Sequence, residues 1–414
     1  PSTDPSAIID PVFLASVHKD NIHDRWLQWV KLSLRQRLLS SCYLLEFRQS
    51  TLLAPNHESP ITRILWSNLP FPSYNTLWDA PDPFEWFEIA QKCSLMPRNV
   101  SEATSGHIVG RYDSFQSLIL IAAHYNPLSS PTLHSGSSID QLLHDDPTTR
   151  HQLLTAKLTQ LAPLRALLAV SGETWVLGNK VTSHSEFAAQ KTKLQAWISQ
   201  LWACPVDEYS EPTAEALHIS VAILEQSLRT TEPLVHGLGT ELGLFCAALV
   251  LWAATASANS RLAASCFSTQ QPQSPPASRF DMATTTHPTM LSYSPNQSTY
   301  LVSMHYLPGL QQEASLSSSG RRTSMSHSEI LSNTSQFLVS AFENLTSFNV
   351  VVCKTGCTSL LLWVKMLLRG AFLIEQSNTA INMTSSKHDH GELVNEAIGQ
   401  IERMLDRGWE GWGI

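Results

Sequence analysis

The order of hydrophobic and polar positions along the chain predicts helices almost throughout. No Pro or Gly occurs between Arg25 and Leu53, and apolar residues recur there at helical spacing. We expect one long helix that ends before Pro55, because a proline disfavours the α conformation in the residue ahead of it. Its apolar stripe consists of Trp26, Trp29, Val30, Leu34, Leu38, Cys42 and Leu45.

Later segments carry the same kind of pattern. Tyr112 to Tyr125 is apolar almost all round and indicates a buried helix. Thr148 to Val170 is rich in leucine, and Pro163 is expected to kink or split it. Other helices are predicted from Trp86 to about Gln91 and over residues 185–202, 213–230, 234–255, 328–345, 359–375 and 392–407. Strand signals are weak, so the predicted fold is all-α, an irregular multi-helix bundle.

A change in composition divides the chain. Residues 258–328 are dense in Ser, Thr, Gln and Pro, and such a segment cannot bury enough apolar surface to offset the entropy of ordering. We expect a long disordered insertion here. It would separate a first helical part, residues 1–257, from a C-terminal helical part, residues 329–414. A chain of 414 residues exceeds what one compact core usually supports.

Charge and hydropathy narrow the function classes. The formal net charge is −8, and Lys and Arg do not cluster along any predicted helix face. Nucleic-acid binding needs such clusters to neutralise phosphates, so DNA contact is expected only through a domain missing from this chain.

No apolar run reaches the roughly 20 residues that span a bilayer. Leu242 to Ala254 is interpreted as a buried helix, and no membrane association is predicted. Seven scattered cysteines are expected to be reduced.

The stretch from residue 24 to residue 88 carries the most specific pattern. Its motifs are, in order, Trp26 and Trp29, Arg35-Gln36-Arg37, Leu69-Pro70-Phe71-Pro72, Trp78-Asp79-Ala80 and Phe84-Glu85-Trp86. In this order they closely resemble the middle homology region of fungal zinc-finger transcription factors. Three later segments are similar to the same family: Leu161–Gly178, which contains Trp175, Ala214–Ala254, which contains Trp252, and Cys353–Trp409.

The resemblance implies an α-helical regulatory domain, not an enzyme, that lies C-terminal to two-Cys two-His zinc fingers or to a six-cysteine zinc cluster. Neither spacing occurs in this chain. Zinc is therefore expected only in an upstream DNA-binding domain, and no cofactor is expected here. The family also implies a nuclear protein that controls transcription by RNA polymerase II through co-regulators or a small-molecule effector. The structural markers are Trp26, Trp29, Arg35, Arg37, Pro70, Trp78, Trp86, Trp175 and Trp252.

The arginines of the first helix have two interpretations. They can be solvated charges, or surface partners of Glu46 and Glu85. The family resemblance instead implies that some of them, with Arg35 and Arg37 as candidates, form a semi-buried polar network that holds the helix against the Trp78 segment. The geometry of an arginine–carboxylate fork is suited to such a network.

Other candidate chemistry is weaker. Cys353 and Cys357 could meet on one helix face, but no nearby His pair completes a zinc site. His388-Asp389-His390 is interpreted as a solvated loop. Asp145-Asp146 resembles the magnesium-binding carboxylates of all-α isoprenoid synthases, but further aligned acids are missing, so a helix N-cap is the preferred interpretation. An all-α isoprenoid- or lipid-directed enzyme and a helical interaction scaffold remain the alternatives.

Ser324 is a candidate phosphosite. It follows Arg321-Arg322-Thr323 in the predicted insertion, a sequence that suits a basic-directed kinase. A phosphate there would add roughly −1.5 to −2 charge. An incidental match in serine-rich sequence is the alternative.

Overall fold

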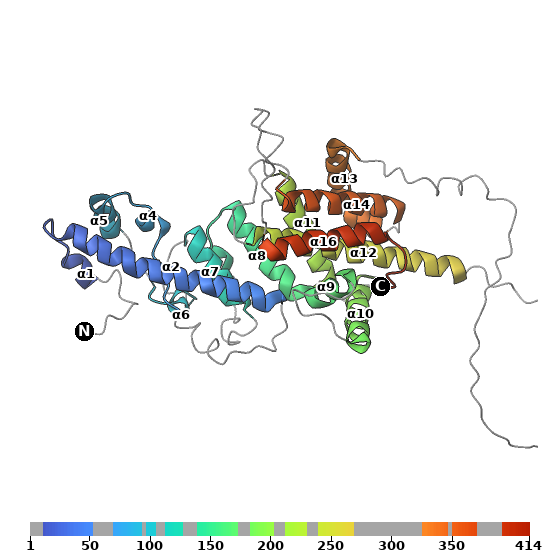
Figure 1. Cartoon of the computed structure of the whole chain (residues 1–414), viewed down its shortest axis with the longest axis horizontal. Helices are drawn as coiled ribbons and strands as arrows, with labels where there is room; N and C mark the ends of the chain where they lie inside the picture. The colour runs from blue at the N-terminus through green and yellow to red at the C-terminus, as the bar shows by residue number, and fades with distance from the viewer. Residues whose placement is uncertain are drawn as a thin grey trace, which may run out of the picture.

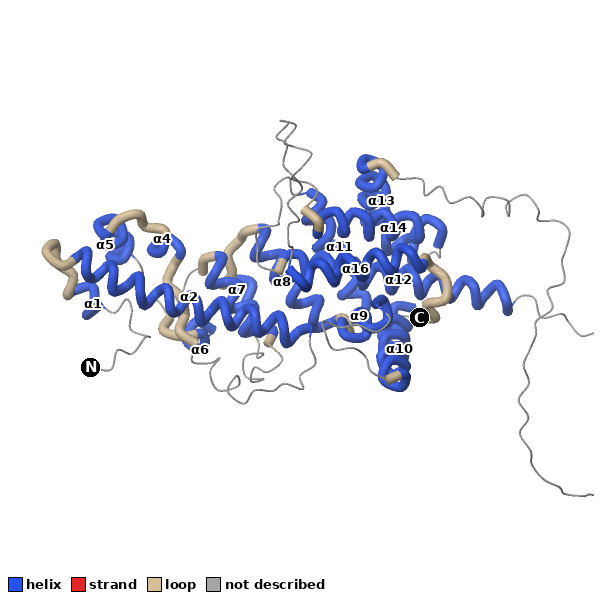
Figure 2. Tube along the Cα trace, in the orientation of Figure 1, coloured by secondary structure: helices blue, strands red, loops and turns tan. Residues whose placement is uncertain are grey.

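A computed structural model gives the fold of this chain (Figure 1). The structure describes residues 11–52, 69–92, 97–104, 112–126, 139–172, 183–202, 212–229, 239–268, 325–346, 350–370 and 391–414. Helices joined by loops make up this part of the chain (Figure 2). Within it, strand-like pairing is limited to an isolated antiparallel bridge between Pro70 and Asn99. The all-α prediction is confirmed.

Helices of very different lengths follow one another along the chain. They are α1 (Pro11–Ala15), α2 (Ile22–Leu52), α4 (Asn75–Trp78), α5 (Pro83–Lys92), α6 (Val100–Thr104), α7 (Ser114–Tyr125), η2 (Ile139–Gln141), α8 (Pro147–Leu161), α9 (Leu164–Gly172), α10 (His184–Ser199), η3 (Gln200–Trp202), α11 (Pro212–Arg229), α12 (Thr240–Ser268), α13 (His327–Thr346), α14 (Val350–Leu368) and α16 (Gly391–Arg407).

Helix α12 lies at the centre of the larger half of the molecule. Every residue from Leu244 to Ser257 is buried, and α8, α9, α10, α11, α13 and α14 all pack against it. By length and composition, Thr240–Leu262 could cross a membrane, with a mean hydropathy of 1.6 in its most apolar window, but 89% of that window is buried inside the protein. This is the position of a core helix, as predicted for Leu242 to Ala254.

Pro163 splits the leucine-rich segment that precedes this core. Helix α8 ends at Leu161, α9 begins at Leu164, and their axes are bent by 82°. The ring of Pro163 removes a backbone donor and cannot continue the first helix. The expected break is confirmed, and the bend lets both segments contact α12.

The long helix α2 extends from the bundle to the other end of the molecule (Figure 1). Toward its N-terminus it packs with α1, α4 and α5 around Trp29, Leu77 and Trp86. Toward its C-terminus, Tyr43 and Leu44 join a second core with α7 and α8. The helix thus belongs to two small cores, whereas α12 organises the third and largest core.

The apolar stripe expected along α2 packs only in its first part, where Trp29 is buried and Trp26 and Val30 pack against the same core. Further along, Leu34, Leu38 and Leu45 are 55%, 62% and 51% exposed, and Cys42 is exposed as well. Beyond Trp29 the buried face consists of Ser33, Gln36, Ser40, Tyr43 and Leu44. Ser33 is compatible with burial because its hydroxyl lies 3.1 Å from that of Ser73. The buried Ser40 hydroxyl, in contrast, has no hydrogen-bond partner among the residues that the structure describes.

The bounds of α12 and α14 differ from the predicted ones. Helix α12 begins at Thr240, after Gly239 with a φ of +88°, and continues to Ser268, beyond the expected boundary at residue 257. Helix α14 begins at Val350, because the segment around Cys353 and Cys357 supplies a buried face of its own. Residues 269–324, most of the predicted insertion, lie outside the described residues.

The C-terminal segment folds back onto the core helix. The Trp412 ring is buried edge-on against Trp252, with centroids 4.8 Å apart, and its Nε1 donates to the Gly408 carbonyl at 2.7 Å. The Arg407 guanidinium lies 3.9 Å from the centroid of the same ring. Asn259 also donates to the Trp409 carbonyl at 3.1 Å. Aromatic packing and backbone hydrogen bonds therefore join the chain end to α12.

We predict that Trp252→Ala lowers the free energy of unfolding by about 3–5 kcal/mol, because it empties a fully buried aromatic site in the largest core. Urea unfolding of the purified protein measures this. Leu393→Ala, at an exposed position of α16, is the control and should change stability by less than about 0.5 kcal/mol. Equal stabilities of the two variants would contradict the central position of α12.

Candidate functional site

Arg37 lies at the centre of a polar network between α2, α4 and α7. Its Nη2 donates to the Ser73 carbonyl at 3.1 Å and to Asn75 Oδ1 at 2.9 Å. Its Cζ lies 4.9 Å from the centroid of the Trp78 ring and 5.1 Å from that of Phe115. The guanidinium is therefore held between two aromatic rings, an arrangement in which cation–π attraction adds to the hydrogen bonds.

The electrostatics of Arg37 reflect this enclosure. Burial lowers the pKa of its guanidinium, while the carboxylates of Asp113 and Asp79 act in the opposite direction. An arginine keeps its charge in such surroundings, since its ordinary pKa is far above neutrality. The network is thus a half-buried cation stabilised by nearby acids and carbonyl oxygens.

Asp113 connects the same network to α7. Its side chain caps the helix by accepting from Gln116 N at 2.9 Å, and Gln116 Oε1 accepts in return from Asp113 N at 3.1 Å. The second carboxylate oxygen accepts from Asn75 N at 2.7 Å, and Gln116 Nε2 donates to the Pro72 carbonyl at 2.8 Å. One capping box therefore also fixes the turn before α4.

A cluster of indole rings continues from this network toward the N-terminal end. The Trp29 centroid lies 5.6 Å from that of Trp86 and 6.5 Å from that of Trp78. Phe13 of α1 meets Trp86 edge-on at 6.4 Å. Trp29 and Trp86 are fully buried, so large aromatic surfaces join α1, α2, α4 and α5.

The structure brings some of the predicted markers together and leaves others apart. Trp29, Arg37, Trp78 and Trp86 share one continuous cluster. Trp26 is half-buried beside His23, whereas Arg35 is exposed and lies outside the network. The two interpretations of the arginines therefore apply to different residues: a network for Arg37 and a solvated charge for Arg35.

The remaining markers lie elsewhere. Pro70 is in the segment that pairs with residues 98–100, where Phe71 N donates to the Arg98 carbonyl at 3.0 Å. Trp252 belongs to the core around α12. Trp175 and Ser324 lie outside the described residues, as do His388 and His390.

Asp113, Gln116 and Asn75 complete the network, although none of them was predicted as a site residue from sequence. Asp113 and Gln116 carried a usable signal, because Asp-x-x-Gln ahead of an apolar run is a capping-box pattern. Asn75 carried none, since its role depends on where α2 passes.

The other acidic and cysteine candidates have structural positions. Asp146 caps α8 by accepting from Thr149 N at 2.9 Å and from its hydroxyl at 2.6 Å, as the N-cap interpretation predicted. Cys353 and Cys357 are buried in the core around α12, and burial raises the pKa of the Cys353 thiol to about 11. In the described part of the chain, no group of three or more His, Cys, Asp or Glu is placed to hold a metal ion.

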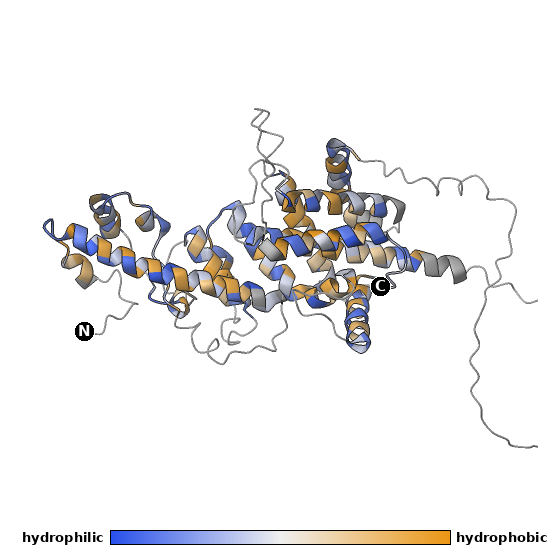
Figure 3. Cartoon of the chain, in the orientation of Figure 1, coloured by the Kyte–Doolittle hydropathy of each residue, from blue (hydrophilic) through white to orange (hydrophobic). Residues whose placement is uncertain are grey.

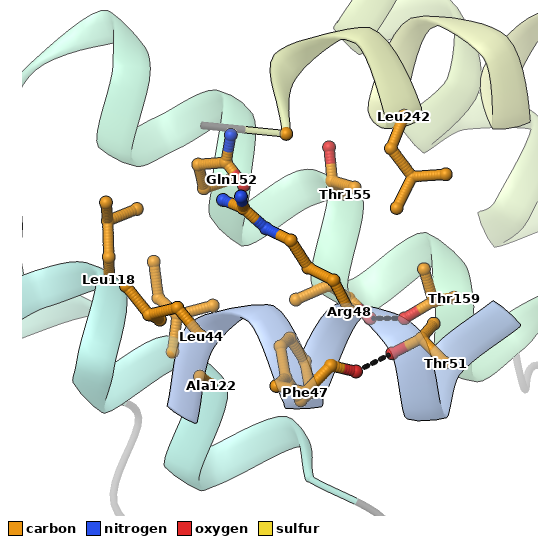
Figure 4. A pocket seen from close by; sticks show the side chains of 13 residues that line it. Leu44, Phe47, Arg48, Thr51, Leu118, Ala122, Gln152, Thr155, Thr159 and Leu242 are labelled. Atoms are coloured by element: carbon orange, nitrogen blue, oxygen red, sulfur yellow. Dashed lines mark hydrogen bonds between the residues drawn. The ribbon is translucent and has the colours of Figure 1, made fainter. Parts of the chain in front are cut away.

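A hollow lies where α2 meets α7, α8 and the start of α12 (Figure 4). The space enclosed within it is about 30 Å³, which is room for one or two water molecules. The lining residues are Leu44, Phe47, Arg48, Thr51, Leu118, Ile121, Ala122, Gln152, Thr155, Ala156, Thr159, Gly239 and Leu242.

Arg48 is the charged residue of this hollow, and its side chain extends across it toward Gln152 (Figure 4). Burial lowers the pKa of its guanidinium, with Glu241 acting in the opposite direction. Gly239 is required at the rim, because its φ is +88° and a Cβ there would lie 2.6 Å from Arg48 Cζ.

A buried histidine stands beside this hollow. His151 is inaccessible to solvent, and its Nε2 lies 3.1 Å from the Thr240 carbonyl at the start of α12. Burial lowers the pKa of this imidazole to about 4. Any Cβ at Gly243 would collide with the ring and with Thr155 Oγ1, so α8 and α12 approach closely only because residue 243 is glycine.

Searches against family models, curated proteins and solved structures found no match to this chain.

We predict that Arg37→Ala lowers the free energy of unfolding by about 2–4 kcal/mol, because it leaves buried oxygen acceptors and two aromatic faces without their cation. Arg35→Ala, two residues away and exposed, is the matched control and should cost less than about 0.5 kcal/mol. Arg37→Lys should fall between them, because an ammonium cannot reproduce the planar fork. Urea unfolding measures all three, and equal losses for Arg35→Ala and Arg37→Ala would refute the network.

We also predict that His151 makes folding sensitive to acid. The pKa of His151 is about 4 in the folded protein and about 6.5 in an unfolded chain. The unfolded state therefore binds the extra proton between these values, and stability falls by roughly 3 kcal/mol as pH drops from about 6.5 to about 4.

Urea unfolding across pH 4–7 measures the contribution of His151 to the pH dependence of stability. His151→Gln should remove that part of the pH dependence, whereas His18→Gln, at an exposed position, should retain it. Identical pH profiles for His151→Gln and the unchanged protein would contradict the assignment.

Proposed function

We propose that this chain is the regulatory domain of a fungal transcription factor that acts in the nucleus on transcription by RNA polymerase II. In this proposal the chain neither contacts DNA nor catalyses a reaction. An upstream domain, in which zinc is expected, would bind the promoter, and this domain would set the output through a co-regulator or a small-molecule effector.

The observation that carries the proposal is the order of motifs between residues 24 and 88, together with the three later segments. Helix α2 and the segment that contains Ser73, Asn75 and Trp78 lie against each other around Arg37. This agrees with the polar network that the resemblance implies. The all-helical architecture agrees with it as well.

A reporter experiment tests the function. Residues 1–414 would be inserted between a heterologous DNA-binding domain and a constitutive activation segment in a fungal cell, with a reporter gene read at matched protein levels. We expect a several-fold change in reporter output relative to the same fusion carrying an unrelated helical protein. The same output from both fusions would contradict a regulatory role and favour the scaffold alternative, and substrate turnover by the purified chain would favour an enzyme.

A further inference from the structure

Helix α2 carries a row of exposed leucines on the side away from its cores. Leu27, Leu34, Leu38 and Leu45 are 40%, 55%, 62% and 51% exposed. At 100° per residue they fall within about 40° of one another, and the row runs for about 27 Å. We call these four residues the leucine stripe. Helix α2 lies along the near side of the molecule, and orange segments alternate with blue along its visible surface (Figure 3).

The spacing of the stripe distinguishes it from ordinary surface leucines. Single exposed apolar residues are common on soluble proteins. Here the steps are seven, four and seven residues, so all four leucines fall on seam positions of a coiled-coil heptad, while the two intervening seam positions carry Lys31 and Ser41. The opposite, buried face carries Ser33, Gln36 and Ser40, so the more apolar side of this part of the helix faces solvent. A second helix lying along the stripe would bury it.

Charges beside the stripe indicate what kind of helix fits. Lys31 lies in the seam itself, between Leu27 and Leu34, and Arg35 lies one turn further along on the adjacent flank; both are exposed. Neither makes an ion pair with another residue in the part of the chain that the structure describes. The middle of the stripe is therefore basic, although the whole chain has a net charge of −8.

A second copy of α2 fits this flank poorly. The intervals between the four leucines are the same in either direction along the helix. Two copies could therefore pair antiparallel with residue 36 at the centre of the pair. That pairing places Arg35 beside its own symmetry mate and brings Asp24 toward Glu46 of the other copy. In a parallel pair Lys31 would face Lys31 of the other copy, and Arg35 would lie against the opposite flank, where no acidic residue occurs. Both arrangements lack opposite charges, and juxtaposed like charges disfavour association.

We propose that the leucine stripe binds an amphipathic helix of a different protein, with apolar residues every three to four positions and Asp or Glu beside its centre. Leu34 and Leu38 would form the middle of the apolar contact, and Lys31 and Arg35 would pair with the acidic residues. This is the helix-against-helix mode of peptide recognition, in which apolar anchors provide affinity and flanking charges select the partner. The inference does not depend on the proposed role in transcription.

Binding of two synthetic peptides to the purified chain tests the proposal. Each is about three heptads long with leucine at the seam positions; one carries Glu at the flanking positions and its sister carries Lys. Fluorescence anisotropy of the labelled peptides should show saturable binding of the acidic peptide, about tenfold or more tighter than that of the basic one. Maleimide labelling of Cys42, which is exposed beside the stripe, should slow when the acidic peptide is bound.

Variants assign the binding to the stripe. Leu34→Glu and Leu38→Glu should each weaken the acidic peptide about tenfold or more, which corresponds to about 1.4 kcal/mol. Leu393→Glu, at an exposed leucine of α16, should leave binding unchanged. The double variant Lys31→Glu/Arg35→Glu should reverse the preference toward the basic peptide. All are surface changes, so circular dichroism and thermal melts should match those of the unchanged protein.

Three results would overturn the proposal. They are a lack of saturable binding by the acidic peptide, binding of both peptides that is insensitive to Leu34→Glu and Leu38→Glu, and a concentration-dependent dimer in sedimentation that Leu38→Glu abolishes. The last result would assign the stripe to a second copy of this chain.

Discussion

The burial of α12 is the constraint on which the larger half of the molecule depends. A helix that is apolar on every side has no face to present to water, so other helices must surround it. Six of the described helices do so, and the sharp bend at Pro163 allows α8 and α9 both to take part. The C-terminal segment adds Trp412 against Trp252. Segments distant in sequence are thereby held in one core.

The other half of the molecule is stabilised differently. Helix α2 has a buried face that mixes tryptophan with serine and glutamine, so its packing relies on particular hydrogen bonds, such as those of Ser33 and Arg37, as well as on apolar area. Arg37 links α2 to the turn before α4, and Asp113 links that turn to α7. These contacts are specific in geometry, because removing one partner leaves the other without its hydrogen bond.

The fold was more predictable than the site. The all-α class, most helix positions and the break at Pro163 follow from local periodicity and from proline chemistry, which act within a few residues. The buried face of α2 did not follow, because Leu34 and Leu38 are outward while Ser33 and Gln36 are inward. Periodicity shows which residues share a face, but it cannot show whether a neighbour covers that face.

The sequence by itself determined that helices form, roughly where each one lies, and that Leu242 to Ala254 must be buried, since propensity and hydropathy are properties of the local chain. Only the tertiary structure decided which of two arginines, Arg35 or Arg37, enters the network, and which side of α2 meets water. These outcomes depend on the positions of Asn75, Asp113 and Trp78, which are far from α2 in sequence. A guanidinium is buried only where such distant groups supply its partners.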